Sequence, residues 1–189
     1  FALRRVSEVG VEIGRRLRQD NRPRRGTRIA ASTHPFWTPM RPPPPPRTDW
    51  FIAEIDGHPC EIHAPANAVP GRALIYLHGV RERWLQEIPG LRDRIEEARL
   101  PVIAPRSGRS WWLDHVIPSF DPQMTPERFV VDRVVAEIGR RFAVSPPGIA
   151  IIGTSMGGQG ALRIAYRHPN TFPVSAAIAP AIDYHAAMR

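Results

Sequence analysis

The chain has 189 residues, with 26 basic and 18 acidic side chains that give a formal net charge of +8, and a single cysteine. This length allows one domain plus an extension and is sufficient to bury a hydrophobic core. One cysteine excludes a fold held together by internal disulfides, and no apolar run approaches the roughly 18 residues needed to span a bilayer.

The first 47 residues differ from the remainder in charge and composition. Residues 1–47 contain 11 arginines against three acidic residues, whereas residues 48–189 contain 15 arginines and 15 acidic residues. A run of five prolines, Pro42 to Pro46, has no backbone donors and favours an extended polyproline spacer. We therefore expect residues 1–47 to be a basic, proline-rich extension without a fixed fold, and residues 48–189 to form the folded domain.

The distribution of charge also bears on partners and location. Because the whole positive excess lies in the extension and the domain is electrically neutral, nucleic acid is not an expected partner. The chain begins Phe-Ala-Leu-Arg-Arg, without the apolar core and small-residue cleavage site of a signal peptide. Together with the lone cysteine, this favours a cytoplasmic location.

A hairpin and a buried strand are predicted at the start of the domain. Residues 50–55 have the aromatic and aliphatic content of a strand, and Asp56-Gly57 is a strong turn signal. Residues 60–64 would then return antiparallel to the first strand. The run 73–78 is almost entirely apolar, which is typical of a strand buried on both faces.

Helices and strands alternate through the rest of the domain. Strands that alternate with helices usually pair in parallel and are covered on both faces. The fold class is therefore α/β, with a mostly parallel sheet between two layers of helices. The expected elements, in chain order, are a helix at 83–99 broken at Pro89-Gly90, a strand at 101–104, a helix from Thr125 to Phe142, a strand at 148–153, a helix at 157–167 and a strand at 173–179.

The segment with the strongest chemical signal is Gly153-Thr154-Ser155-Met156-Gly157, where an apolar strand passes directly into a helix. A serine on such a turn projects its hydroxyl above the sheet, and small residues are needed on both sides because neighbouring backbone comes very close. The helix start also presents free amides, so the Met156 N–H is a candidate donor to an oxyanion. The alternative is a glycine-rich turn whose serine has no chemical role.

A second candidate segment, His78-Gly79-Val80, follows the buried strand at 73–78. When a serine attacks a carbonyl carbon, negative charge develops on the carbonyl oxygen, and two fixed donors stabilise it. We expect the second donor to be the Val80 N–H, with Gly79 allowing the backbone to turn. His78 is expected to support this loop by hydrogen bonding rather than to act as the base.

These two segments together resemble the α/β-hydrolase superfamily. The Ser110-Trp111-Trp112 loop and the Gln159-Gly160-Ala161-Leu162 sequence after the serine are most similar to the branch that contains esterase D, feruloyl esterases, polyhydroxybutyrate depolymerases and mycolyltransferases. The resemblance implies a three-layer α/β sandwich over about residues 50–185. It further implies transfer of an acyl group from a small-molecule ester or thioester to Ser155, followed by hydrolysis, with no cofactor. Enzymes of the oligopeptidase type share the same serine turn, so peptide cleavage stays open.

The C-terminal part of the sequence departs from this family. The superfamily order is nucleophile, acid and then histidine, with the last two on loops after two further strands, and these strands are missing before the chain ends at Arg189. Asp183 and His185 follow Ser155 in the required order but lie only two residues apart. One interpretation places the true acid and base in a segment beyond the chain, and the other makes Asp183 and His185 a compact pair. We favour the first, because acid and base normally come from separate loops.

Two further expectations concern the substrate site and metals. Trp111 and Trp112 are candidates for an aromatic wall against the acyl group, with simple packing as the alternative. The histidines show no metal-ligand spacing, so no metal site is expected.

A second function stays open. Without a base, the chain would instead be an inactive hydrolase fold that serves as a binding module.

Overall fold

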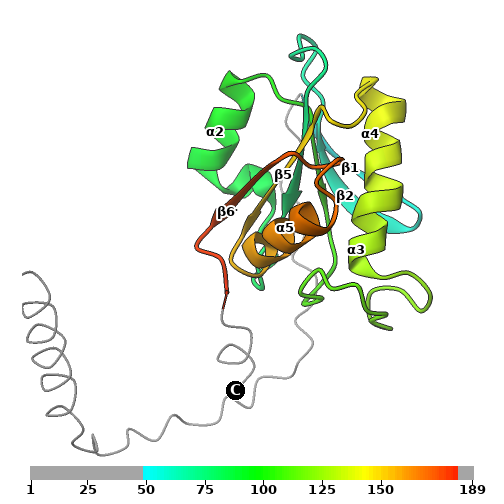
Figure 1. Ribbon diagram of the computed structural model, residues 1–189. Helices are drawn as coiled ribbons and strands as arrows, with labels where there is room; N and C mark the ends of the chain where they lie inside the picture. Colours follow the sequence, from blue (N-terminus) through cyan, green and yellow to red (C-terminus); the bar gives the residue numbers. More distant parts are fainter. Residues whose placement is uncertain (1–48, 183–189) are drawn as a thin grey trace, which may run out of the picture. The chain divides into compact units, whose positions relative to one another are not determined.

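The structure is a computed structural model that describes residues 49–182, all of which fall in one compact unit. The predicted extension and the candidate pair Asp183 and His185 lie outside the described residues. The described part is a six-stranded sheet with helices on both faces (Figure 1), as expected for the α/β class.

The sheet has the strand order β1-β2-β4-β3-β5-β6. β1 and β2 form the predicted hairpin, β2 pairs antiparallel with β4, and all further pairings are parallel. The sheet is therefore mostly parallel, which confirms the prediction. Its strands are β1 (Trp50–Ile55), β2 (His58–His63), β3 (Ala73–Leu77), β4 (Val102–Pro105), β5 (Ile149–Thr154) and β6 (Val174–Ile178).

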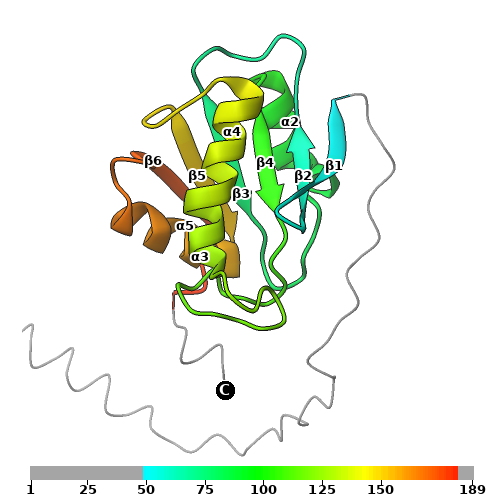
Figure 2. The same cartoon turned by 90° about the vertical axis from the view of Figure 1, so that its right-hand side faces the viewer.

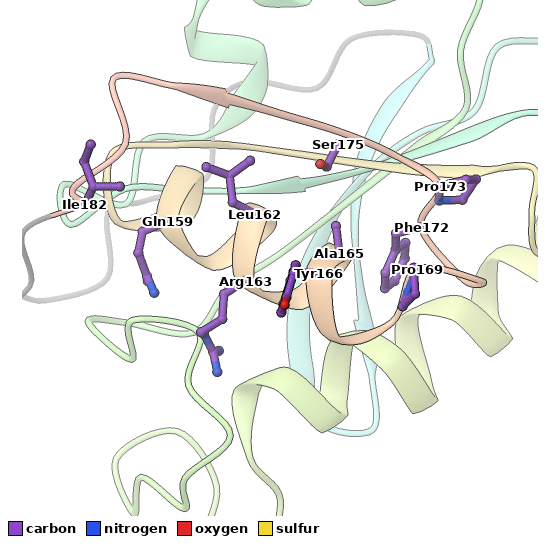
Figure 3. Close-up of a pocket in the computed structure, with 10 residues that line it drawn as sticks. All are labelled: Gln159, Leu162, Arg163, Ala165, Tyr166, Pro169, Phe172, Pro173, Ser175 and Ile182. Atoms are coloured by element: carbon purple, nitrogen blue, oxygen red, sulfur yellow. The ribbon is translucent and has the colours of Figure 1, made fainter.

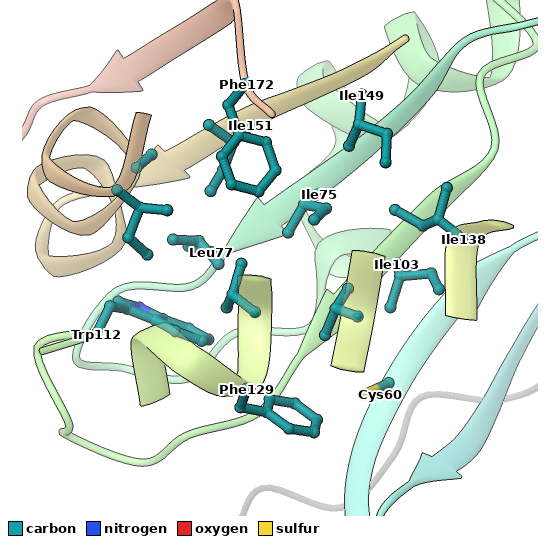
Figure 4. Close-up of a cluster of buried hydrophobic side chains, with 14 of the residues drawn as sticks. Cys60, Ile75, Leu77, Ile103, Trp112, Phe129, Ile138, Ile149, Ile151 and Phe172 are labelled. Carbon is teal, nitrogen blue, oxygen red and sulfur yellow. The ribbon is translucent and has the colours of Figure 1, made fainter. Parts of the chain in front are cut away.

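Two hydrophobic cores make the fold a three-layer sandwich, because the side chains of a strand alternate between the faces of the sheet. Ile75 and Leu77 of β3 face a core that includes Ile138 and Ile164, whereas Leu74 of β3 faces a smaller core on the opposite side. The first core is shown in Figure 4. Every residue of β3 is buried, as its apolar run predicts.

The helices are divided between the two faces of the sheet. Figures 1 and 2 show α2 on one face and α4 and α5 on the other. No helix within residues 49–182 is long and apolar enough to cross a membrane. The helical elements are the short 3₁₀ turn η1 (Leu85–Glu87), α2 (Pro89–Glu97), α3 (Pro126–Arg128), the π-helical stretch η2 (Phe129–Val134), α4 (Val135–Phe142) and α5 (Met156–Arg167).

The helix predicted at 83–99 is shorter than expected. As predicted, it is interrupted near Pro89-Gly90: it is divided into η1 and α2, and α2 begins at Pro89 because proline lacks the amide that an uninterrupted helix would require. The helix predicted from Thr125 is continuous through α3, η2 and α4. Its cap is as predicted, since the Thr125 hydroxyl accepts a hydrogen bond of 3.1 Å from the Arg128 amide.

β6 is the least buried strand of the sheet. The side chains of Val174 and Ile178 are 62% and 44% exposed, and β5 is its one strand partner among the described residues. An apolar groove lies next to β6, along the outer side of α5 (Figure 3). Ser155 is not among the residues that line it, so this groove is separate from the candidate active site. The lining residues are Gln159, Leu162, Arg163, Ala165, Tyr166, Pro169, Phe172, Pro173, Ser175 and Ile182.

Candidate active site

Ser155 occupies the single-residue turn between β5 and α5. Its backbone angles are φ 56° and ψ −116°, a conformation that residues other than glycine rarely adopt. The turn is fixed by the Ser155 amide, which donates to the Ile178 carbonyl (2.9 Å), and by the Ser155 carbonyl, which accepts from the Ala181 amide (3.2 Å). The serine side chain makes no capping hydrogen bond to α5. The strained serine of the predicted strand-to-helix turn is therefore present, and its hydroxyl is not used to cap the helix.

The glycines on either side of Ser155 are required by close backbone contacts. A Cβ on Gly157 would lie 2.0 Å from the Leu77 carbonyl oxygen, and a Cβ on Gly153 would lie 2.0 Å from the Gly157 oxygen. Neither position therefore accommodates a side chain without a backbone shift. These contacts press the first turn of α5 against the carboxyl ends of β3 and β5, as the sequence pattern predicts.

The loop after β3 lies directly beside Ser155. A Cβ built on Gly79 would be 3.2 Å from the Ser155 Cβ and 3.0 Å from the Thr154 carbonyl oxygen. The next residue, Val80, is 36% exposed, and Met156 opens α5 on the other side of the serine. The amides at a helix start have no intrahelical partner, so the Met156 N–H is free of the helix ladder. The structure thus brings the two predicted segments together.

Hydrogen bonds to both ring nitrogens fix the His78 side chain. Nε2 accepts a bond of 3.1 Å from the Ser107 amide, so Nδ1 carries the proton and donates to the Gly79 carbonyl at 2.9 Å. Burial, and to a lesser extent the charge of Arg106, lowers the pKa of His78 from 6.5 to about 3. His78 is therefore neutral at physiological pH, and its acceptor nitrogen is already occupied.

The Gly79 carbonyl has a second donor, the Glu82 amide at 2.9 Å. The peptide between Gly79 and Val80 is trans, and in a trans peptide the carbonyl and the following N–H point in opposite directions. Holding the Gly79 oxygen by two donors therefore also fixes the direction of the Val80 N–H. This is the structural basis on which His78 supports the loop.

The tryptophan loop, Ser110-Trp111-Trp112, also contacts the segment His78-Gly79-Val80. Trp112 is fully buried among the core side chains (Figure 4). Its indole Nε1 donates to the His78 carbonyl at 3.2 Å. A Cβ on Gly160 would lie 2.7 Å from the Trp112 Cβ, so this glycine of α5 makes room for the indole. The neighbouring Trp111 is 9% exposed. The burial of Trp112 supports the packing interpretation of this residue rather than a wall of the substrate site.

Five of the eight non-glycine residues with positive φ among residues 49–182 lie after the carboxyl ends of strands β3 to β6, and the other three are Asp56, Arg99 and Ala143. Non-glycine residues with positive φ occur in the loops after β3 (Glu82, 48°), β4 (Trp111 and Trp112, both 56°), β5 (Ser155, 56°) and β6 (Ala179, 45°). Such conformations persist where the surrounding contacts impose them, and they are enriched at functional sites. In open α/β sheets, this edge is also where ligands bind.

The described histidines do not supply a base for Ser155. Among residues 49–182, no histidine ring is hydrogen-bonded to the Ser155 hydroxyl, and His115 is exposed. No group of three or more His, Cys, Asp or Glu side chains in this part of the chain is arranged to hold a metal ion. The other rings have their own partners: His58 with Asp121 (3.2 Å), His63 with the Leu100 carbonyl (2.8 Å), His78 with Gly79 and Ser107, and His168 with Glu127 (3.1 Å).

An ion-pair network that the sequence did not reveal ties α3 to α5. The carboxylate of Glu127, 1% exposed, faces Arg163 (2.8 Å), Arg167 (2.9 Å) and His168 (3.1 Å). Arg163 also donates to the Trp112 carbonyl. The network therefore connects the helix that follows Ser155 to the tryptophan loop. In the sequence, Glu127 is one acidic residue in a first helical turn, and nothing distinguishes it from a solvated one.

These features define an α/β-hydrolase: a mostly parallel sheet between two helix layers, and a strained serine directly after β5. The loop after β3 that contains Gly79, called the glycine loop below, lies beside this serine. The family model described as "Putative esterase" matches residues 60–188, more than half of the chain. The chain belongs to this esterase family. The comparison with curated proteins finds no match.

Solved structures share the fold. An S-formylglutathione hydrolase from Agrobacterium tumefaciens is 24% identical, with a TM-score of 0.58 over 69% of this chain and 57% of its own. The fluorophosphonate-binding serine hydrolase FphF from Staphylococcus aureus is 17% identical, with a TM-score of 0.57 over 69% and 54%. A ferulic acid esterase is 20% identical, with a TM-score of 0.51 over 65% and 53%. The chain thus spans slightly more than half the length of these similar proteins.

Proposed function

We propose that the protein is a serine hydrolase that cleaves a carboxylic ester or thioester through an acyl-Ser155 intermediate. One observation carries this proposal: Ser155 is held at φ 56° between β5 and α5, and Gly79 of the loop after β3 lies so close that a Cβ built on it would be 3.2 Å from the Ser155 Cβ. Membership of the esterase family supports the same reaction class. The similar solved structures include an S-formylglutathione hydrolase and a ferulic acid esterase, whose names are consistent with this reaction class.

In this mechanism, the Ser155 hydroxyl attacks the carbonyl carbon of the substrate and its proton passes to a base. The base then gives the proton to the leaving alcohol or thiol, and water repeats the sequence on the acyl-serine. The amides of Met156 and Val80 donate to the oxyanion in both halves of the reaction. Removal of one such donor typically slows the reaction about 100-fold to 1,000-fold. The reaction needs no cofactor.

The proton acceptor and its acid are proposed to lie beyond residue 182. This follows from the partners of the described histidines, since the acceptor nitrogen of His78, which precedes the loop beside Ser155, is occupied by the Ser107 amide. Asp183 and His185 are the candidates within this chain. The favoured alternative remains a separate acid and histidine supplied by a continuation of the polypeptide. In the product of the complete reading frame, loss of turnover in His185→Ala would support the compact pair, and full turnover would support the continuation.

The test of the proposal is hydrolysis of p-nitrophenyl acetate and butyrate by the 189-residue chain and by the product of the complete reading frame. We expect turnover that is abolished in Ser155→Ala. The matched control is Ser175→Ala, because Ser175 lies on the exposed face of β6 and should not affect turnover. Absence of Ser155-dependent turnover in both proteins would overturn the esterase proposal. It would favour the second candidate, an inactive hydrolase fold that binds a partner. The lack of a base among residues 49–182 would then explain the inactivity.

A further inference from the structure

Arg106 is a buried cation that the proposed mechanism does not use. It follows β4 directly, and its side chain is 3% exposed. One terminal nitrogen donates to the Glu82 carbonyl at 2.6 Å, and the other donates to the Glu82 carboxylate at 3.2 Å. The guanidinium also lies over the Trp84 ring, 4.3 Å from its centroid. Arg106 therefore binds the loop after β3 from the neighbouring strand.

A charge in this position is costly unless its partners are well placed. Removing a guanidinium from water costs free energy, and only well-placed partners offset this cost. The cost is high at Arg106, because its Nε atom is buried without a hydrogen-bond partner. The partner residue, Glu82, is itself in the left-handed region with φ 48°. The Arg106 fork, which grips both the carbonyl and the carboxylate of Glu82, is a contact capable of imposing that conformation.

Glu82 connects Arg106 to the candidate oxyanion donor. The Glu82 amide donates to the Gly79 carbonyl and closes the turn from Gly79 to Glu82. The same carbonyl belongs to the peptide that presents the Val80 N–H. The residue after Arg106, Ser107, holds His78, which is the second donor to the Gly79 carbonyl. Both hydrogen bonds that orient this peptide are therefore anchored in the segment 106–107.

We propose that Arg106 is a positioning residue for the loop after β3, which supplies the Val80 N–H. By hydrogen bonding to Glu82, Arg106 keeps the Val80 N–H directed at the oxyanion. It acts through Glu82, and none of its contacts in the structure involves Ser155. The proposal rests on the esterase function above. It assigns a role in transition-state stabilisation to a residue outside the serine turn and the glycine loop.

The test compares Arg106→Met and Arg106→Lys with the control Arg94→Met. Arg94 is an arginine of α2 whose side chain is 80% exposed and pairs with Glu97 on the surface. On p-nitrophenyl acetate we expect Arg106→Met to lower kcat about 10-fold to 100-fold with KM changed less than twofold, because the donor acts on the transition state. Arg106→Lys, which keeps the charge but not the fork, should recover part of the loss. Arg94→Met should match the parent protein.

A loss of packing alone must be distinguished from a loss of positioning. Thermal unfolding of each variant measures folding separately, and binding of a trifluoromethyl ketone, whose serine adduct carries an oxyanion, measures the donor directly. We expect its affinity to fall in proportion to kcat/KM in Arg106→Met. Unchanged kcat and unchanged ketone affinity in a folded Arg106→Met protein would overturn the proposal.

The Val80 amide gives a readout that does not depend on turnover. In ¹⁵N-labelled protein, the amide signal of Val80 should shift in Arg106→Met and stay in place in Arg94→Met. If the parent protein shows no Ser155-dependent turnover, the esterase proposal fails, and the role of Arg106 in oxyanion stabilisation fails with it. If turnover is present but the Val80 signal is unmoved, the positioning role alone is overturned.

Discussion

The Ser107 amide donates to Nε2 of His78 over 3.1 Å, and this bond determines which nitrogen of the ring carries a proton. The remaining N–H can then reach the Gly79 carbonyl, 2.9 Å away. A histidine that ends a buried strand is thereby made a donor to the backbone of the loop beside Ser155. Protonation of the ring would break the bond from Ser107. Burial, which disfavours a charged ring, and repulsion by Arg106 both lower the pKa of His78 and keep the ring neutral.

This arrangement predicts a pH dependence of stability. The pKa of His78 is lowered to about 3 in the folded protein from its ordinary 6.5, so between these values the unfolded chain binds a proton that the folded protein does not. Stability from this group is complete above pH 6.5 and is lost as the pH falls toward 3. Urea unfolding of the parent protein and of His78→Gln at several pH values should differ in slope by about 1.4 kcal/mol per pH unit within the window. Parallel slopes would contradict the assignment.

The close contact at Gly157 predicts a large effect of a single methyl group. Gly157→Ala places a Cβ against the Leu77 carbonyl, and we expect it to lower the free energy of unfolding by about 3 kcal/mol or more. Gly90→Ala is the matched control, because Gly90 lies in α2 with nothing within 4 Å of its Cβ position. That substitution should leave stability unchanged or raise it by up to about 1 kcal/mol. Similar urea midpoints for the two variants would show that α5 is not pressed against β3.

The backbone strain at Ser155 can be measured by comparing two side-chain removals. At φ 56° glycine has no steric penalty, so Ser155→Gly should be about 1 kcal/mol more stable than Ser155→Ala. The same pair of substitutions at Ser175, within strand β6, should give the opposite order, because glycine weakens a strand. If alanine were the more stable residue at both positions, Ser155 would not be strained.

The single cysteine provides a probe of the core. Burial, with a further contribution from Glu137, raises the pKa of the Cys60 thiol to about 12. The thiolate that reacts with disulfide reagents is therefore nearly absent below pH 9. We expect no reaction of the native protein with Ellman's reagent and rapid reaction in urea. Fast labelling without denaturant would place Cys60 outside the core.

The elements that the sequence predicts well are those with local causes. The run 73–77 is apolar and is a buried strand, and the glycines around Ser155 permit the tight turn between β5 and α5. The helix predicted at 83–99 is divided near the predicted break, since Pro89 begins a new helix. Its first part is only the short turn η1, whose Leu85 and Gln86 amides bind the Glu61 carboxylate (2.5 and 3.1 Å), a contact between distant segments.

Contacts between distant segments were beyond the sequence pattern. Arg106 and Glu82 are 24 residues apart, and each lies in a loop whose path depends on the neighbouring strand. The place of Trp112 beneath His78 depends on the gap left by Gly160, which belongs to another helix. Such pairings arise from tertiary packing, so neither periodicity nor a motif identifies them.

The central claim is tested most directly by labelling the chain with a fluorophosphonate and measuring the intact mass. We expect one adduct, located on Ser155 by peptide mapping, in the 189-residue chain or in the product of the complete reading frame. The adduct should be absent in Ser155→Ala and retained in Ser175→Ala. An adduct that persists in Ser155→Ala, or no adduct in either protein, would contradict the account.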